Sequence, residues 1–382
     1  MVKKRIALLG ATGSIGSSTL EVVAAHPDRF ELVLATAHHN ADALFNLATR
    51  FQIPNLLLTG APSNTTPDGV PNGVNVHYGE EALQTLLPTL DYDIAVNAIS
   101  GSAGLVSTLF VLETGKPLAL ANKESLVMAG HLVRELQAKY GSLLLPVDSE
   151  HSALFQAIGS SPAQHIRAVH LTASGGAFRT LPLEAFDRIT VAQALRHPNW
   201  DMGAKVTLDS ATLFNKALEV MEAHWLFGLD WEQIKVVVHP QSVIHSLVEF
   251  VDGSFLAQLS KPDMKLPILY ALSYPERIDS QLVKTDLCQL PALQFSEVET
   301  ERYPLYYLGM EAAKAGGILP TVVNAANEAA LKLFLEGKIP FTGIAPAVRE
   351  AMSLVKPSAH PSLQTILEVN RSVYQSVLAK YL

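Results

Sequence analysis

The sequence predicts an α/β protein that begins with a Rossmann-like doubly wound parallel sheet. Two features of residues 1–150 carry this prediction. Short apolar runs alternate with helical stretches, which is the pattern of a parallel sheet covered by helices on both faces. The first run, residues 5–9, leads through a glycine-rich turn at residues 10–16 into a helical stretch at residues 17–25. A strand, a glycine turn and a helix in this order indicate a nucleotide-binding domain.

The composition of the chain limits the classes of function. Its 382 residues are 48% hydrophobic and 17% charged, so we expect a globular protein of two or three domains. A net charge of -8 argues against a nucleic-acid-binding surface. Cys288 is the only cysteine, which excludes an internal disulfide. The sequence shows no signal peptide and no apolar segment long enough for a bilayer, so we expect a cytoplasmic protein without a membrane partner.

The glycine turn has the spacing GxxGxxG, with Gly10, Gly13 and Gly16. Glycines allow the backbone to approach a pyrophosphate, whose charge is met by the N–H groups and the dipole at the start of the next helix. A glycine turn without a bound nucleotide is the alternative. The position of the turn directly after the first strand favours the nucleotide.

Further strands of this domain are expected at residues 30–35, 55–58, 94–99, 117–120 and 142–147, with helices at residues 41–51 and 80–87. The end of the second strand usually contacts the adenosine ribose of a dinucleotide. An acid there favours the NAD hydroxyl, and a cation or small polar group favours the NADP phosphate. Here His38, His39 and Asn40 come before the first acid, Asp42. This order favours NADP.

Two acids directly follow the last of these strands. Asp148 and Glu150 flank Ser149, and His151 comes next. Acids beyond the carboxyl end of a strand can hold a hard divalent cation such as Mg²⁺ or Mn²⁺. They also fit the start of a helix through residue 158, with Asp148 or Ser149 as the N-cap and Glu150 favourable to the helix dipole. These residues alone favour the helix cap over the metal site.

Beyond residue 150 the pattern changes, and we expect an α+β catalytic domain. Strands are predicted at residues 168–173, 236–239, 245–250 and 254–259, the last two as a hairpin. Two loops rich in turn-forming residues, 174–178 and 197–203, lie between the first two strands. The interval is long enough to form a lid over a reactive site, with Trp200 and Met202 as its apolar cover. A tryptophan buried in an ordinary loop is the alternative.

Residues 209–225 are predicted to form one helix that starts with capping residues. Helical spacing places Asn215, Lys216 and Glu219 on one side of it. Ser210 would then lie near the N-terminal end, where the helix dipole and the charge of Lys216 favour a phosphate. A surface Lys–Glu pair is the alternative, but apolar neighbours leave only a narrow polar stripe on this helix.

The last part of the chain is predicted to be a linker and a helical bundle. Residues 274–302 lack periodicity, whereas residues 324–335, 344–355 and 363–382 have helical apolar spacing. The expected organisation is a nucleotide-binding domain (1–148), a catalytic domain (149–273) with a lid at about 174–204, a linker (274–302) and a C-terminal helical bundle (303–382).

Seven motifs, in the same order, resemble the 1-deoxy-D-xylulose-5-phosphate reductoisomerase family over essentially the whole chain. They are GATGSIG (10–16), ANKESLV (121–127), PVDSEHS (146–152), TASGGAF (172–178), HPNWDMG (197–203), DSATLFNK (209–216) and NAANE (324–328). The resemblance implies rearrangement of the ketose phosphate to a branched aldehyde. Hydride from NADPH then reduces the aldehyde to 2-C-methyl-D-erythritol 4-phosphate, a step of isoprenoid biosynthesis. It also implies a homodimer.

The resemblance also implies which residues form the site. One Mg²⁺, Mn²⁺ or Co²⁺ would be held by Asp148, Glu150 and Glu219, so the family favours the metal at the acid turn, with Lys123 as a further catalytic residue. The substrate phosphate would lie among Ser174, Ser210, Asn215 and Lys216, with His197 nearby, and the other substrate oxygens near Lys123, Ser149 and the metal. The cofactor would contact Thr12, Gly13, Ser14, Ile15, Asn40, Asn122, Glu124 and Gly203.

The chain departs from the family pattern where the adenosine end of the cofactor is expected. His38 and His39 precede Asn40, where family members commonly have a glycine and then a basic or polar residue. Neutral histidines would bind a 2′-phosphate less firmly than a lysine would. Two other classes of function are considered: a metal-independent NAD(P) dehydrogenase and a non-catalytic nucleotide sensor. NADPH oxidation with and without Mn²⁺ would separate these classes.

Overall fold

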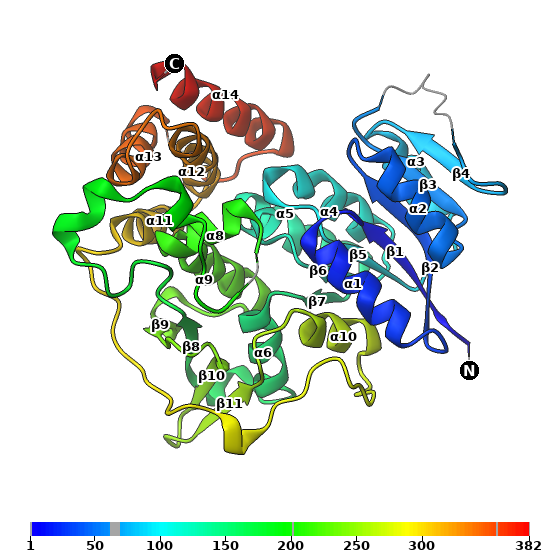
Figure 1. Cartoon of the computed structure of the whole chain (residues 1–382), viewed down its shortest axis with the longest axis horizontal. Coiled ribbons are helices and arrows are strands. Elements are labelled where there is room, and N and C mark those ends of the chain that lie inside the picture. The colour runs from blue at the N-terminus through cyan, green and yellow to red at the C-terminus, as the bar shows by residue number, and fades with distance from the viewer. Residues whose placement is uncertain (1, 62–68, 201, 357, 382) are drawn as a thin grey trace. The chain divides into compact units, whose positions relative to one another are not determined.

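The structure of the chain, a computed structural model, describes residues 2–61, 69–200, 202–356 and 358–381. Their contacts divide them into two compact units. Unit 1 contains the residues up to Ser125, His131–Ser152 and Asp263–Lys284, and unit 2 contains Leu126–Gly130, Ala153–Pro262 and the residues from Thr285 onward. Figure 1 shows the elements with the labels used below. None of the described helices is long and apolar enough to cross a membrane.

Unit 1 is built on a seven-stranded parallel sheet with the order β4–β3–β2–β1–β5–β6–β7. Its strands are β1 (Lys4–Leu9), β2 (Phe30–Ala37), β3 (Asn55–Leu58), β4 (Asn75–Tyr78), β5 (Ile94–Asn97), β6 (Leu118–Leu120) and β7 (Leu144–Pro146). The chain moves outward from β1 to β4 and then crosses to β5 on the other side. This order confirms the predicted doubly wound sheet. The sequence does not predict β4, because this half-exposed edge strand lacks an apolar run.

Glycines shape the first turn of this sheet. α1 (Ser14–Ala25) begins directly after Gly13, earlier than the predicted start at residue 17. Gly10 has a φ of +85°, and a Cβ there would come within 2.9 Å of the backbone of Ala98 beyond β5. A Cβ on Gly16 would overlap the backbone oxygen of Gly10. These two positions therefore require glycine, whereas a Cβ on Gly13 would make only ordinary contacts.

Besides α1, the helices of unit 1 are α2 (Ala41–Phe51), α3 (Ala82–Leu86), α4 (Gly104–Glu113), α5 (Lys123–Tyr140) and α10 (Lys265–Ser273), with the short turns η1 (Leu87–Thr89) and η2 (Gly101–Ala103). Within α5, Leu126–Gly130 belong to unit 2. α6 (Ser149–Ile158) follows β7. The sequence predicts α10 as part of the catalytic domain, but in the structure this helix contacts α1, β6 and β7 in unit 1. There it buries Ile268, Leu269 and Leu272. The sequence of an apolar helix alone does not indicate which of the two sheets the helix packs against.

Unit 2 contains a four-stranded mixed sheet with the order β11–β10–β8–β9. Its strands are β8 (Ile166–Ala173), β9 (Ile234–Val238), β10 (Ile244–Phe250) and β11 (Phe255–Leu259). β10 and β11 form the predicted antiparallel hairpin. β8 pairs with β10 antiparallel and with β9 parallel. All four strands lie close to their predicted ranges.

The single helix predicted over residues 209–225 is wrong, because the structure has two helices there. α8 (Ala204–Ala211) ends in a turn, and α9 (Phe214–Phe227) begins beyond it. Leu213 in this turn has a φ of +59°, a left-handed conformation that leucine rarely adopts. The hydroxyl of Thr212 stabilises the turn, since it donates to backbone carbonyls of α8 and accepts from the first N–H of α9.

The other helices of unit 2 are α7 (Val191–Ala194), α11 (Pro304–Ala315), α12 (Leu319–Leu335), α13 (Ile344–Leu354) and α14 (Leu363–Tyr381), with the short turns η3 (Ala163–His165), η4 (Leu183–Arg188), η5 (Trp231–Gln233), η6 (Leu287–Gln289) and η7 (Phe341–Gly343). The predicted C-terminal bundle is present, but it shares one core with α8 and α9. α12 contacts α8, α11, α13 and α14, and its many buried alanines allow this close packing. The catalytic and C-terminal domains expected from the sequence are therefore one compact unit.

The linker predicted at residues 274–302 divides between the two units. Residues up to Lys284 belong to unit 1. The remainder is irregular apart from η6 and a single bridge between Ser296 and Val238 of β9.

Candidate functional site

The carboxyl ends of β1 and β5 flank the point at which the strand order of unit 1 reverses. Open parallel sheets bind their ligands at such a point. The predicted cofactor residues here are Thr12, Gly13, Ser14 and Ile15, which form the turn after β1 and the start of α1. Gly13 is the N-cap and supplies no capping side chain, so the N–H groups of the first helical turn face outward. This turn has the shape and the donors to bind a pyrophosphate.

Asn122 connects this edge of the sheet with the start of α5. Its side-chain oxygen caps α5 by accepting from the N–H of Ser125 at 3.0 Å. Its Nδ2 donates to the carbonyls of Ile99 at 2.8 Å and Gly101 at 2.7 Å, in the loop after β5. The same Nδ2 lies 3.2 Å from a carboxylate oxygen of Glu124. The two predicted cofactor residues, Asn122 and Glu124, are thus held together and buried.

A buried series of polar side chains supports Asn122, and sequence reasoning missed it. Asn97 at the end of β5 donates to the hydroxyl of Thr108 at 2.8 Å. That hydroxyl lies 2.9 Å from the hydroxyl of Ser125, which in turn donates to Asn122. All four side chains are fully or almost fully buried. The available signal was an asparagine and a threonine inside apolar elements, where a buried polar group needs a partner.

His38, His39 and Asn40 lie exposed at the end of β2, as predicted. The two imidazole rings are 4.0 Å apart, and Nδ1 of His38 is 3.0 Å from the hydroxyl of Thr59. Asn40 caps α2 by accepting from the N–H of Ala43 at 3.1 Å. The three residues therefore form a polar group without an acid at the carboxyl end of the second strand.

The acid turn after β7 is held by a lysine. Asp148 forms an ion pair with Lys123, the first residue of α5, and their side chains are only 12% and 11% exposed. The hydroxyl of Ser149 donates to the carboxylate of Glu150 at 2.5 Å. α6 starts at Ser149, and the carbonyl of Asp148 accepts from the N–H of Ser152 at 2.8 Å. The predicted helix start is therefore present, and the carboxylate of Asp148 pairs with Lys123.

In unit 2, Asn215, Lys216 and Glu219 gather on one side of α9, as predicted. The carboxylate of Glu219 accepts from the amide of Asn215 and from the ammonium of Lys216. The side chain of Glu219 is fully buried and that of Lys216 is 4% exposed. The alternative of a solvated surface pair is thereby excluded.

Ser174, His197 and Ser210 also come together in unit 2. Nε2 of His197 lies 3.0 Å from the hydroxyl oxygen of Ser174, at the end of β8. Gly176 has a φ of +66°, and a Cβ there would overlap the carbonyl of Ser210 and lie 2.8 Å from the Cα of Ala211. The loop after β8 therefore packs directly on the end of α8, which brings Ser174 close to Ser210.

The backbone determines the tautomer of His197. The N–H groups of Asn199 and Trp200 point at its Nδ1, at 3.1 and 2.9 Å, so Nδ1 is the acceptor and Nε2 carries the proton. Burial lowers the pKa of His197 to about 4, which keeps the ring neutral. The oxygen of Ser174 accepts from this Nε2–H and from the N–H of Gly176 at 3.1 Å. The hydroxyl proton of Ser174 is therefore available to a further acceptor, such as a phosphate oxygen.

The first half of the predicted lid is fixed to the helices of unit 2. The hydroxyl of Tyr303 donates to the carbonyl of Gly175 at 2.8 Å, and burial raises the pKa of that hydroxyl to about 12. The guanidinium of Arg302 donates to the carbonyls of Phe178 and Leu181 at 3.0 and 2.6 Å. The later part of the predicted lid, which contains Trp200 and Met202, is also attached, since the amide of Asn199 donates to the carbonyl of Pro240 at 2.6 Å and to the hydroxyl of Ser242 at 2.9 Å. Gly203 at its end is the N-cap of α8.

The predicted site residues thus form two groups. Lys123, Asp148, Ser149 and Glu150 lie together in unit 1, at the carboxyl edge that also carries the cofactor residues. The residues predicted for the phosphate, together with Glu219, lie in unit 2. Gly203 is the one predicted cofactor residue in unit 2.

Three family models match the chain. The model of 1-deoxy-D-xylulose 5-phosphate reductoisomerase matches residues 6–130, that of the 1-deoxy-D-xylulose 5-phosphate reductoisomerase C-terminal domain matches residues 144–227, and that of the DXP reductoisomerase C-terminal domain matches residues 259–376. Together they span most of both units.

Similar proteins and structures have the same description. The 1-deoxy-D-xylulose 5-phosphate reductoisomerase of Shouchella clausii is 46% identical over 379 residues, covering 98% of this chain and 100% of that protein. The structure of the enzyme from Zymomonas mobilis in complex with NADPH is similar with a TM-score of 0.92 and 38% identity, covering 100% of this chain and 99% of that one. A DOX-P reductoisomerase with NADPH, fosmidomycin and magnesium is similar with a TM-score of 0.91 and 40% identity, covering 99% and 98%.

Proposed function

Since the chain belongs to the 1-deoxy-D-xylulose 5-phosphate reductoisomerase family, we propose that its two groups of polar residues form the active site of that enzyme. The chain is an NADPH- and metal-dependent oxidoreductase that converts 1-deoxy-D-xylulose 5-phosphate to 2-C-methyl-D-erythritol 4-phosphate. The observation that supports the proposed site best is the buried carboxylate of Glu219 next to Asn215 and Lys216. It supports the proposal that a metal ligand and phosphate donors lie side by side on α9.

The carboxylates of Asp148, Glu150 and Glu219 would hold the divalent metal. Carboxylate oxygens are the ligands that Mg²⁺ and Mn²⁺ prefer, and a carboxylate as fully buried as that of Glu219 needs a positive charge beside it. Lys123 and Lys216 pair with Asp148 and Glu219, so their ammonium groups balance the charge of these two carboxylates when no metal is bound. When bound, the metal polarises the carbonyl and hydroxyl oxygens of the substrate.

The phosphate of the substrate would bind at the α8–α9 turn. The hydroxyl oxygen of Ser174 already accepts two hydrogen bonds, so its proton can be donated to the phosphate. Ser210 and Asn215 lie on either side of the turn. Lys216 adds a positive charge, which a dianionic phosphate favours. His197 stays neutral and orients Ser174. Binding of the phosphate holds the rest of the substrate in place for the reaction.

The reacting carbon atoms would lie near the start of α5. Asn122, Lys123 and Glu124 are consecutive, and the first and the last of them are the predicted contacts of the cofactor. Lys123 projects to the acid turn, where its ammonium pairs with Asp148. Substrate and nicotinamide would therefore meet at one helix start, with the charge of Lys123 beside the oxygen that becomes negative during the rearrangement.

The 2′-phosphate of the cofactor would contact the polar group at the end of β2. His38 and His39 are exposed there, and neither carries a negative charge. Asn40 turns its side-chain oxygen to the cap of α2, so its Nδ2 group and the two rings are the donors at this place.

The chain would form a homodimer through the edge of the unit 2 sheet. β11 is an edge strand, and its exposed side chains include Phe255, Leu256 and Leu259. An exposed apolar edge strand promotes association unless a partner covers it. Leu256→Glu should therefore yield a monomer in light scattering, whereas Leu354→Glu at an exposed position of α13 should not. A dimer in both variants would exclude this edge as the interface.

The overall function is tested by NADPH oxidation with 1-deoxy-D-xylulose 5-phosphate after chelation of divalent metal. Activity should disappear on chelation and return with Mg²⁺ or Mn²⁺. A metal-independent dehydrogenase would keep its activity after chelation, and a nucleotide sensor would show no oxidation under any of these conditions. Either result would overturn the assignment.

A further inference from the structure

We propose that unit 2 contains a second small-molecule site, which binds an aromatic monoanion behind the α8–α9 turn and thereby lowers the KM for the phosphorylated substrate. The site is a pocket of about 430 Å³ between η4 and the first residues of α11 and α13. Ligand pockets in proteins usually measure about 300–1,000 Å³. None of the residues proposed for metal, substrate or cofactor lines this pocket. It is therefore separate from the proposed active site.

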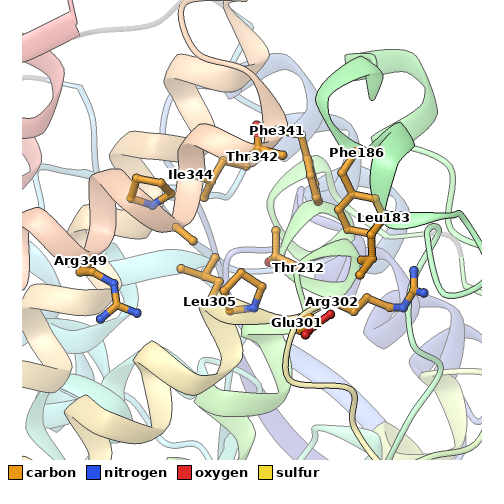
Figure 2. Close-up of a pocket in the computed structure, with 13 residues that line it drawn as sticks. Leu183, Phe186, Thr212, Glu301, Arg302, Leu305, Phe341, Thr342, Ile344 and Arg349 are labelled. Atoms are coloured by element: carbon orange, nitrogen blue, oxygen red, sulfur yellow. The ribbon is translucent and has the colours of Figure 1, made fainter.

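The walls of the pocket are apolar and partly aromatic. Figure 2 shows Leu183 and Phe186 on one side, facing Leu305 and Ile344 on the other. Phe341 also lines the pocket, and its ring meets that of Phe186 edge to face, with centroids 6.1 Å apart. A flat aromatic ring inserted here would extend this edge-to-face packing. The body of the ligand should accordingly be aromatic.

The charges around the pocket select a single negative charge. The charged residues that line the pocket are Glu301, Arg302 and Arg349, and together they carry a net charge of +1. Arg302 is already engaged by Glu299 and by backbone carbonyls. Arg349 is exposed and has no ion pair within the part of the chain that the structure describes. It is the cation available to a ligand, while Glu301 disfavours a second negative charge.

Thr212 connects this pocket with the proposed phosphate site. It lines the pocket, and its hydroxyl joins the end of α8 to the start of α9. The turn that it stabilises separates Ser210 from Asn215. A ligand favours the conformation that it fits, so filling the pocket should favour the arrangement of this turn seen in the structure. The KM for the substrate should fall, and the affinity for NADPH should not change.

Binding is tested by fluorescence titration with 8-anilinonaphthalene-1-sulfonate, an aromatic monoanion, in the presence of saturating NADPH. Ala345→Trp places a large side chain in the pocket wall. Leu354→Trp adds the same side chain at a 74% exposed position of the same helix and is the matched control. We expect a saturable site in the wild type and in the control, and its loss in Ala345→Trp. Equal binding by all three proteins would overturn the proposal.

The charge preference is tested with N-phenyl-1-naphthylamine, which has the same aromatic body without the sulfonate. Arg349→Gln should weaken binding of the sulfonate about three- to tenfold, as expected for loss of one partly exposed charge-assisted hydrogen bond, and leave the neutral probe unaffected. Thermal unfolding of this surface variant serves as the folding control. Equal effects on both probes, or no effect on either, would exclude the role of Arg349.

The coupling to catalysis is tested by measuring KM with the sulfonate at saturation. We expect KM to fall by about fivefold, the lower end of typical couplings between sites, and to remain constant in Ala345→Trp. An unchanged or higher KM at saturation would exclude the coupling. This part rests on the proposed function, whereas the titrations do not. An enzyme inactive with this substrate would overturn the proposed function and leave the binding test intact.

Discussion

Replacing Glu219 by glutamine should abolish turnover and weaken unit 2 at the same time, for two separable reasons. The buried carboxylate accepts from Asn215 and from Lys216. The two donors contact different oxygens of the carboxylate, and glutamine replaces one of these oxygens by an NH2 group, so in this geometry it cannot accept from both donors. Its amino group would face one of them, and Lys216 would lose the negative charge beside it. Turnover would stop because the proposed metal would lose a ligand.

The loss of stability follows from the burial of this pair. Removing one partner of a buried ion pair typically costs about 3–5 kcal/mol. In a domain of about 150–250 residues, each kcal/mol lowers Tm by about 2–4 °C, so the Tm of Glu219→Gln should fall by at least about 6 °C. Circular dichroism during heating measures this change. The Kd for NADPH should stay close to that of the wild type, because most of the predicted nucleotide contacts lie in unit 1.

The double variant Lys216→Met/Glu219→Gln separates the two effects. Replacing both partners of a buried pair by neutral groups of similar size is often close to neutral for stability. The Tm should therefore rise back toward the wild-type value, while turnover stays absent. Near-normal turnover in Glu219→Gln would refute the role of Glu219 at the metal. An unchanged Tm in that single variant would refute the energetic importance of the buried pair.

Three further predictions concern the phosphate site, the glycine turn and the pH dependence of stability. Lys216→Ala should raise the KM for the phosphorylated substrate, because an anion contact is lost, and an unchanged KM in steady-state assays would count against the phosphate site. Gly16→Ala should lower Tm, since its Cβ would overlap the backbone of Gly10, whereas Gly13→Ala should keep Tm and weaken NADPH binding in a fluorescence titration. Similar Tm values for both glycine variants would contradict this difference. Burial lowers the pKa of His197 to about 4, below the value of about 6.5 that it has when unfolded, so the unfolded chain takes up this proton first as the pH falls. The stability that neutral His197 contributes is complete above about pH 6.5 and is lost between there and about pH 4. His197→Gln should lose less stability over this range in thermal unfolding, and an identical pH profile would disprove the argument.

Signals that lie within one element were sufficient to predict most of the fold. β3 and α2 occupy the predicted residues, 55–58 and 41–51. The strand is a short apolar run because both faces of a parallel sheet are covered. The helix begins where Asn40 caps it, and this capping residue is visible in the sequence. The glycine turn was predicted for the same reason, since strand, turn and helix adjoin in the chain.

Features that depend on contacts between distant residues could not be predicted in this way. α10 covers the sheet of unit 1 although it follows the strands of unit 2, and its apolar residues would suit either sheet. The hydrogen bonds from Asn97 through Thr108 to Ser125 join three elements, and no spacing in the sequence relates them. The residue types of the acid turn favoured the helix cap, but they did not reveal the partner of the Asp148 carboxylate. In the structure the helix start and the ion pair between Asp148 and Lys123 coexist.

The break between α8 and α9 shows why the helix prediction failed at the place where the chemistry is proposed. In a continuous helix, residues five apart are rotated by about 140° around the axis, so Ser210 and Asn215 could not face one phosphate. The turn removes this restriction, but it requires Leu213 to adopt a left-handed conformation, which costs roughly 1–2 kcal/mol. The hydrogen bonds of Thr212 and the close packing of Gly176 on the end of α8 offset that cost. Local propensity favours one helix here, and the contacts that break it come from a loop more than thirty residues earlier in the chain.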